Sequence, residues 1–468
     1  REEPRPTRTP PMPPPRKYRL NKKYRLNMSN ERYVAAVEVS SSKIVAVVGK
    51  IDDEGQFEVI ASDHERGVES VRYGIVQNLE ETAVRIDRIL QRLERKPAIA
   101  PHTITGVFVG LSGRSLRSIS TTVSLTLPND TEITQAILDQ LNTQARQTDI
   151  DSSLMVVDAI PRTYTIGKYE TTSPRGMVGS DITATFDLIV CRPEMQRNLT
   201  RTLTEKVKVD VKAFLVTALS TAAVTLSVEE KRQGCMLVDM GAETTTVTIY
   251  KKGSLVYFAT LPMGGRNITR DITSLNVLEE KAEDIKTTSG NAIASETQSS
   301  LNLGGLKMSE VQSIIVARAE EIVANIIEQI SYAGLKEADL PGGIVCVGGG
   351  SRLNGIMDLL AQKTGLNVRR GQLPAYISIS DTRAQQVDTL QAIALLYIGA
   401  TNSTDSCLEI LPQDELPATG VANASQPAEE PKPKTKPKKR SGWLSSISGR
   451  LADMFAGDSE DDSDLMDQ

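Results

Sequence analysis

Apolar residues follow two different spacings along the chain from Arg32 onward. Apolar runs at 33–49, 236–239 and 247–250 are typical of strands, whereas 79–93 places apolar residues three and four positions apart, as on one face of a helix. Strand-like and helix-like segments alternate over this part of the chain, so the pattern predicts an α/β protein. The strand–turn–strand arrangement that begins near Tyr33, and again near Cys235, indicates two related halves.

The alternation is interrupted between Arg114 and Val190. This stretch contains one helix-like run and two strand-like runs, at 133–148, 154–160 and 182–190. We therefore expect an inserted subdomain here. Helix-like runs at 194–207 and 215–230 then lead back to the strand pattern.

The two ends of the chain lack this periodicity. Residues 1–27 are rich in Pro and basic residues and are predicted not to fold on their own, as a disordered arm or an artefact of the chosen start before Met28. Residues 401–440 are rich in Pro, Ala, Ser, Thr and charge, which predicts a flexible linker. Six basic residues gather at its end: Lys432, Lys434, Lys436, Lys438, Lys439 and Arg440.

Apolar periodicity returns after the linker. Large apolar residues recur at steps of three and four, namely Trp443, Leu444, Ile447, Leu451, Met454 and Phe455. Because Lys438, Lys439 and Arg440 come just before it, this segment predicts an amphipathic helix lying on an anionic membrane. A helix that binds a groove in a partner protein is the alternative. The acidic end that follows, 458–467, would be repelled by an anionic surface.

Overall composition excludes several classes of protein. The 468-residue chain has 54 Lys and Arg against 59 Asp and Glu, a net charge of −5 that argues against nucleic acid as a partner. Its four cysteines are scattered, without the close pairs that bind zinc or form a redox dithiol. No apolar run approaches the roughly 20 residues that span a bilayer, and no signal peptide is apparent, so we expect a cytosolic protein.

Three turns rich in Gly, Ser and Thr are candidate phosphate and nucleotide contacts. Free backbone N–H groups and missing Cβ atoms let such turns approach a phosphate or a flat ring closely, although an ordinary tight turn is the competing interpretation of each one alone. Asp239 ends a strand, where it could hold a metal-bound water. The turns comprise Ser40, Ser41, Ser42 and Lys43; Asp239, Gly241, Thr244 and Thr245; and Gly348, Gly349, Gly350 and Ser351.

The order of these turns resembles the actin/Hsp70/sugar-kinase superfamily and, within it, the FtsA family of bacterial cell-division proteins. The resemblance covers Tyr33 to about Gly399 and adds the tail helix. Further segments that carry it are Val107 to Ser120, Pro174 to Gly179, Leu261 to Gly265 followed by Asp271, and Ala282 to Lys286.

The resemblance implies a two-lobed actin-like ATPase fold with a cleft for ATP and Mg2+. The first two turns would face the phosphates, with Asp239 holding Mg2+ through water. The adenosine side would be formed by Gly264, Gly265, Glu283, Lys286 and the third turn, Gly348 to Ser351. The expected divisions are a disordered extension (1–30), the first lobe (31–113 and 194–230), an FtsA-type insert (114–193), the second lobe (231–400, with a smaller subdomain at about 275–340), the linker (401–440), the membrane helix (441–456) and an acidic tail (457–468).

The implied function is that of an adaptor in cell division. Such a protein binds ATP, self-associates into filaments and tethers FtsZ polymers to the cytoplasmic face of the cell membrane at the division site, with other division proteins as further partners. FtsZ would bind within 275–340, where Arg318 is a candidate contact. A solvated charge beside Glu320 and Glu321 is an equally consistent interpretation of Arg318.

This sequence departs from the superfamily at both phosphate turns. Glu38 and Ser40 stand where Asp and Gly are usual, and Ala242 and Glu243 stand where glycines are common. A displaced carboxylate can cost about a hundredfold in rate, so we expect nucleotide binding with slow or absent hydrolysis. The opposite hypothesis is that Glu243 aligns the attacking water. A PilM-like pilus-assembly ATPase and a small-molecule kinase on the same fold are the alternative functions.

Overall fold

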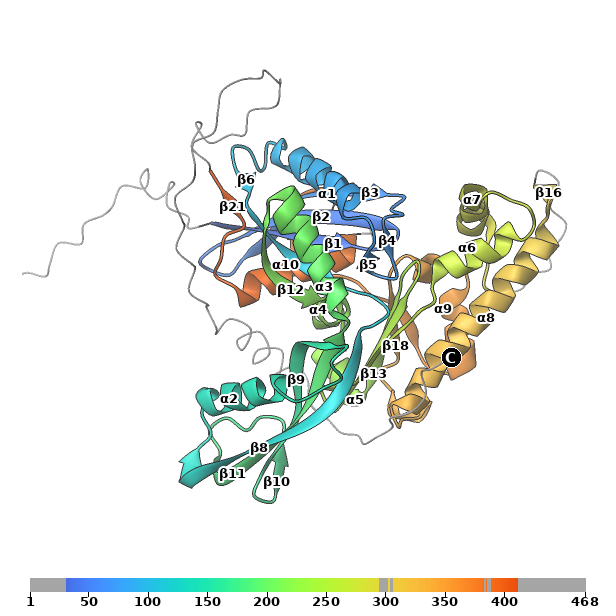
Figure 1. The fold of residues 1–468 in the computed structure, drawn as a ribbon. Coiled ribbons are helices and arrows are strands. Elements are labelled where there is room, and N and C mark those ends of the chain that lie inside the picture. The colour runs from blue at the N-terminus through green and yellow to red at the C-terminus, as the bar shows by residue number, and fades with distance from the viewer. Residues whose placement is uncertain (1–30, 294–301, 304–305, 383, 385–388, 411–468) are drawn as a thin grey trace, which may run out of the picture.

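The computed structural model describes residues 31–293, 302–303, 306–382, 384 and 389–410. The expected N-terminal extension, the part of the expected linker beyond residue 410, the expected membrane helix and the expected acidic tail therefore lie outside the described residues. The described part forms two lobes and an inserted subdomain, organised by one six-stranded and one nine-stranded sheet (Figure 1).

The first lobe is built on the six-stranded sheet. Its central strand β1 is buried from Val34 to Val39, because it lies between β2, its antiparallel neighbour, and β7, its parallel neighbour. In order, the strands are β12 (Asp210–Val216), β7 (Gly106–Leu111), β1 (Arg32–Val39), β2 (Lys43–Ile51), β3 (Phe57–Arg66) and β20 (Ser378–Ile379).

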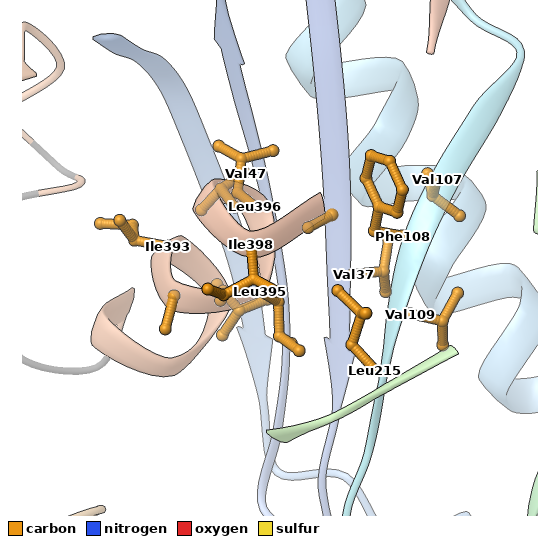
Figure 2. Close-up of a cluster of buried hydrophobic side chains, with 14 of the residues drawn as sticks. Val37, Val47, Val107, Phe108, Val109, Leu215, Ile393, Leu395, Leu396 and Ile398 are labelled. Atoms are coloured by element: carbon orange, nitrogen blue, oxygen red, sulfur yellow. The ribbon is translucent and has the colours of Figure 1, made fainter. Parts of the chain in front are cut away.

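Two helices show how the sequence pattern forms the core of this lobe. Helix α1 (Leu79–Glu94) begins at Asn78, whose side chain accepts the N–H of Glu81, and it buries an apolar stripe that includes Ile86 and Leu93. Helix α10 (Leu390–Asn402) is apolar on nearly all sides and is buried accordingly. Figure 2 shows its side chains beside the sheet, with Leu396 near Val47 of β2.

The inserted subdomain has its own small core. Helix α2 (Gln135–Arg146) covers a sheet face on which alternate residues of β11, such as Ile182, Phe186 and Leu188, are buried. The insert projects away from both lobes in Figure 1. Its strands are β8 (Arg117–Glu132), β9 (Met155–Ile166), β10 (Tyr169–Thr171) and β11 (Val178–Cys191).

The sheet of the insert continues into the second lobe, through pairing of Arg117 on β8 with Ala259 on β15. The remaining strands of the nine-stranded sheet are β15 (Ser254–Leu261), β14 (Thr245–Lys251), β13 (Cys235–Met240), β18 (Ile344–Val347) and β19 (Val368–Arg370). The helices of this lobe are α5 (Val228–Gln233), α6 (Gly265–Thr273), α7 (Glu279–Ser289), α8 (Met308–Tyr332) and α9 (Ile356–Thr364).

Shorter elements complete the described part. The hairpins and small pairs are β4 (Val71–Arg72) with β5 (Ile75–Val76), β6 (Thr103–Ile104) with β21 (Leu408–Glu409), and β16 (Asn302–Leu303) with β17 (Leu306–Lys307). The helical pieces are α3 (Pro193–Thr200), the π-helix η2 (Arg201–Val207), α4 (Thr217–Thr225) and the 3₁₀ turns η4 (Glu337–Asp339) and η5 (Gly350–Arg352).

The α/β fold with two lobes and an insert agrees with the sequence analysis, but three boundaries differ. The second lobe was expected to extend to residue 400, but strand β20 and helix α10 lie in the first lobe. Strand β20 pairs with β3, and α10 buries its apolar residues in the core of that lobe. Strand β21 extends the folded part into the expected linker. The helix expected at 215–230 is two helices, because Ser227 caps α5 in a reciprocal arrangement with Glu230.

Candidate functional site

The first candidate turn closes on itself. It joins β1 to β2, and both the backbone N–H and the hydroxyl of Ser40 donate to the carbonyl of Lys43, each at 3.0 Å. The neighbouring Ser41 is buried, and its Oγ accepts the N–H of Gly74 at 3.3 Å. Lys43 lies 3.9 Å from the buried carboxylate of Glu38. The Glu at this position is therefore ion-paired within its own hairpin.

The second candidate turn is held from outside. Its backbone closes through the N–H of Gly241 and the carbonyl of Thr244 at 2.8 Å, and the Thr245 hydroxyl donates to the Met263 carbonyl at 2.8 Å. Glu243 is only 2% exposed, and its carboxylate faces one backbone N–H and three guanidinium groups. These are the N–H of Tyr73 (2.7 Å), Arg72 Nε (2.8 Å), Arg270 Nη2 (3.0 Å) and Arg266 Nη1 (3.3 Å).

These contacts decide what Glu243 can do chemically. Burial by itself would raise the pKa of this carboxyl, but the Tyr73 N–H, the Arg72 and Arg266 guanidinium groups and the Ser41 hydroxyl together hold the pKa below its ordinary value. A carboxylate with a lowered pKa and three cationic partners is a poor general base. The geometry therefore argues against Glu243 as the residue that activates water.

Asp239 ends strand β13 beside both turns. Burial is the main cause of its raised pKa; the amide of Gln391 and the charge of Lys43 act in the opposite direction. Gln391 Nε2 donates to both carboxylate oxygens, at 2.8 and 2.7 Å, and so joins α10 of the first lobe to β13 of the second. A carboxylate held this firmly beside two phosphate-type turns has the chemistry to hold a hydrated Mg2+ ion.

Glycines allow the second turn, the third turn and the start of α6 to pack closely against one another. A Cβ on Gly264 would lie 2.6 Å from the carbonyl oxygen of Gly241, and one on Gly348, whose φ is +82°, would lie 2.6 Å from Asp239 Oδ1. A Cβ on Gly350 would lie 3.0 Å from the Gly241 carbonyl. The second and third turns and the start of α6 therefore form one cradle.

Glu283 and Lys286 lie beside the beginning of α6, at the edge of this cradle. Lys286 Nζ donates to the Gly265 carbonyl (3.1 Å), the Thr269 hydroxyl (2.9 Å) and Glu283 (2.6 Å). The pKa of Lys286 is lowered, mainly by burial. The charge of Glu283 acts in the opposite direction and partly offsets this effect. This network fixes α7 against the beginning of α6.

Gly349 and Ser351 differ in how they contribute. A Cβ on Gly349 would meet no protein atom within 4 Å, so this position borders open space. Ser351 is buried and its hydroxyl donates to the Gly348 carbonyl at 2.8 Å, which stabilises the turn instead of offering a free hydroxyl. The third turn therefore presents backbone, not side chains, to the space beside it.

Two groups of predicted residues lie elsewhere. Arg318 on α8 donates from Nε and Nη2 to Asp271 on α6, at 2.5 and 3.1 Å, and also pairs with Glu321. It therefore joins two helices, and its contact with a partner protein stays a prediction. The residues predicted to contact a membrane, Lys438 to Phe455, lie outside the described residues. In the part that the structure describes, helices are too short or too polar to cross a bilayer.

Several residues of this site were not predicted from the sequence, although some of them carry a signal. Arg266 and Arg270 are one helical turn apart after a Gly–Gly pair, and Gln391 is a polar residue at the start of an apolar helix; both features are visible signals. Arg72 and Tyr73 carry no comparable signal, because their role depends on a contact with a residue 170 positions away.

Comparison with known proteins finds two family matches. Residues 236–381 match the family "Cell division protein FtsA", and 113–190 match "SHS2 domain inserted in FTSA". Cell division protein FtsA of Porphyromonas gingivalis is 29% identical over 389 residues, covering 79% of each chain. The FtsA of Pseudomonas aeruginosa is 24% identical over 420 residues, covering 87% of this chain and 96% of that protein.

Among solved structures, a chain of the PilM–PilN type IV pilus biogenesis complex is similar in fold. Its TM-score is 0.56 at 16% sequence identity, covering 78% of this chain and 98% of that one. A likeness at this level of identity concerns the fold alone.

Proposed function

Because the chain belongs to the FtsA family of actin-like cell division proteins, we propose that it binds MgATP between its lobes and tethers FtsZ polymers to the cell membrane. The observation that carries this proposal is the pair of family matches. They cover both the second lobe and the insert, and the insert is named for its place in FtsA. The pilus-assembly alternative rests on a shared fold without comparable sequence identity.

The cradle supports nucleotide binding. Ser40 to Lys43 and Gly241 to Thr245 would contact the phosphates, Asp239 would hold Mg2+ through water, and Gly348 to Gly350 with Lys286 would border the adenosine. Backbone N–H groups at glycine-rich turns are suited to phosphate, and the cation would neutralise charge between them. With Glu243 engaged by arginines, we expect slow or absent ATP hydrolysis.

The tethering role rests on the tail. The segment from Trp443 to Phe455 would lie in the membrane interface, with the basic residues up to Arg440 drawn to anionic lipid. Each basic residue near such a surface contributes about 1 kcal/mol, so the cluster and the helix together suffice for reversible binding. Self-association into filaments would multiply these contacts. The protein would then be a peripheral protein of the cytoplasmic face at the division site.

Co-sedimentation with anionic liposomes tests this function. The full chain would be compared with a chain truncated after Pro431, each with and without MgATP and purified FtsZ. We expect only the full chain to pellet and to carry FtsZ with it. Equal pelleting of both chains, or of neither, would contradict the anchor. A double variant, Trp443→Glu with Leu451→Glu, that still bound liposomes would contradict it as well.

A further inference from the structure

One tight turn contacts both candidate phosphate turns and the beginning of the insert. It is the turn of the β4–β5 hairpin, in which Tyr73 and Gly74 have φ values of +49° and +80°, as a two-residue hairpin turn requires. Gly74 cannot carry a side chain, because a Cβ there would lie 1.9 Å from the Ser112 carbonyl oxygen. The turn is therefore fixed against the chain just before the insert.

On one side, two successive backbone N–H groups of this turn donate to the two candidate phosphate turns, one in each lobe. The N–H of Tyr73 donates to Glu243 of the second lobe at 2.7 Å, and the N–H of Gly74 donates to Ser41 of the first lobe at 3.3 Å. Arg72 adds its guanidinium at 2.8 Å from Glu243. A change in the separation of the two phosphate turns must strain at least one of these contacts.

On its other side, the same turn contacts the residues that open the insert. The Tyr73 carbonyl accepts the N–H of Arg114 at 3.2 Å, and the Arg114 guanidinium lies over the Tyr73 ring, 5.1 Å from its centroid. A Cβ on Gly113 would lie 2.7 Å from the Tyr73 carbonyl oxygen. Strand β8 begins only three residues after Arg114.

The insert is also bonded to the second lobe. The Ser118 hydroxyl accepts the N–H of Phe258 at 3.2 Å, close to the pairing of Arg117 with Ala259. Deeper in the insert, Arg162 forms a buried ion pair with Asp187 and donates to the Val256 carbonyl at 3.3 Å. Because the insert is covalently joined to the first lobe but hydrogen-bonded to the second, movement between the lobes must reorient it.

We propose that Glu243 is a positioning residue, and that the turn Arg72 to Gly74 transmits the state of the two phosphate turns to the insert through Arg114. The inference rests on the proposed nucleotide binding and adds its consequence. A nucleotide that draws both turns onto its phosphates fixes the separation of Ser41 and Glu243, and hence the position of the Tyr73 carbonyl. The insert then presents a different orientation to partners in the bound and free states.

Distance measurement between two spin labels in the full chain tests this inference. Labels would be attached at Glu170→Cys on the insert and Ala317→Cys on α8, both exposed positions. The four native cysteines are buried, so they should react slowly. Distances would be recorded with and without MgATP, and MgATP affinity would be measured on the same proteins.

Two variants and one control separate the steps. Arg114→Gln removes the guanidinium from the Tyr73 ring but keeps the backbone N–H bond to the Tyr73 carbonyl, so it should keep MgATP affinity within about twofold and reduce the distance change. Glu243→Gln should lower affinity by about tenfold and show no distance change at saturating MgATP. The control, Glu230→Gln, removes a carboxylate that pairs with Arg369 elsewhere in the second lobe, and it should behave as the unaltered protein does.

Each outcome has one meaning. Distance changes of undiminished size in both Arg114→Gln and Glu243→Gln would overturn the inference, as would an unaltered protein that binds MgATP without any distance change. If Glu243→Gln fails to fold, Arg114→Gln decides, because its side chain contacts the turn and not the phosphate turns. An unaltered protein that does not bind MgATP would overturn the proposed function itself.

Discussion

The two candidate phosphate turns occupy equivalent places in hairpins of the two lobes, yet they are stabilised in different ways. The first turn is held by Ser40, which bonds within its own hairpin. The second turn depends on Glu243, whose four partners come from the other lobe and from helix α6. The first turn is therefore locally determined, whereas the second is set by the relation between the lobes.

The two turns therefore respond differently to movement of the lobes. A turn whose hydrogen bonds stay within its own lobe, as those of Ser40 and Ser41 do, keeps its shape when the lobes move. A turn that is held across the cleft changes when the lobes move, and it resists that movement in return.

The largest effect is expected for Glu243→Ala. Removal of the carboxylate leaves the Arg72, Arg266 and Arg270 guanidinium groups close together without their shared anion, so we expect a loss of about 3 kcal/mol in the free energy of unfolding. Urea denaturation would measure it, with Glu170→Ala, an exposed carboxylate of the insert, as the control. A loss no larger than in the control would mean that the contacts across the cleft contribute little.

A smaller loss is expected for Gln391→Leu. Without the Gln391 amide, the buried carboxylate of Asp239 loses the donor that bonds to both of its oxygens, which should destabilise the fold by about 2 kcal/mol. The same denaturation assay applies, and Thr401→Ala provides a control near the end of the same helix. Unchanged stability would show that water replaces the amide at no cost.

Ser40→Ala should have a still smaller effect. The hydroxyl bond to the Lys43 carbonyl is lost, but the backbone N–H of Ser40 still closes the turn, so we expect a loss of about 1 kcal/mol or less. Ser42→Ala is the neighbouring control. A loss as large as that of Glu243→Ala would remove the distinction between the two turns.

The pH dependence should separate the two carboxylates of the second turn. The pKa of Glu243 is lowered in the folded protein, so its stabilisation is complete above its ordinary value of 4.5 and is lost as pH falls through the lowered folded value. The pKa of Asp239 is raised, so its ionisation disfavours folding as pH rises from its ordinary value of 3.8 through the folded value.

Denaturation of Glu243→Gln and Asp239→Asn from about pH 3 to about pH 7 would measure these opposite trends. Relative to the unaltered protein, Glu243→Gln should lose stability as pH rises, whereas Asp239→Asn should gain it. Parallel curves for the two variants would contradict the assignment of their environments.

The local sequence pattern was sufficient to predict much of the fold. It was not sufficient where contacts between distant residues determine the structure. The strands around Ser40 and Gly241, the helix at 79–93 and the insert followed from hydrophobic spacing and turn residues. The return of α10 to the first lobe did not, because an apolar helix does not reveal which sheet it covers. Similarly, the glycine-rich turns can be recognised in the sequence, but the partners of Glu243 required the three-dimensional arrangement.

MgATP binding by Gly349→Leu tests whether the nucleotide occupies the space beside the third turn. The φ of Gly349 is −64°, which suits any residue, and a Cβ there meets no protein atom within 4 Å, so the variant should fold normally while its side chain fills the space assigned to the nucleotide. Gly334→Asn, at a left-handed position that also borders open space, is the control. We predict that Gly349→Leu loses most MgATP affinity at an unchanged melting temperature while the control binds normally. Equal affinity in both variants would contradict the assignment of the nucleotide site.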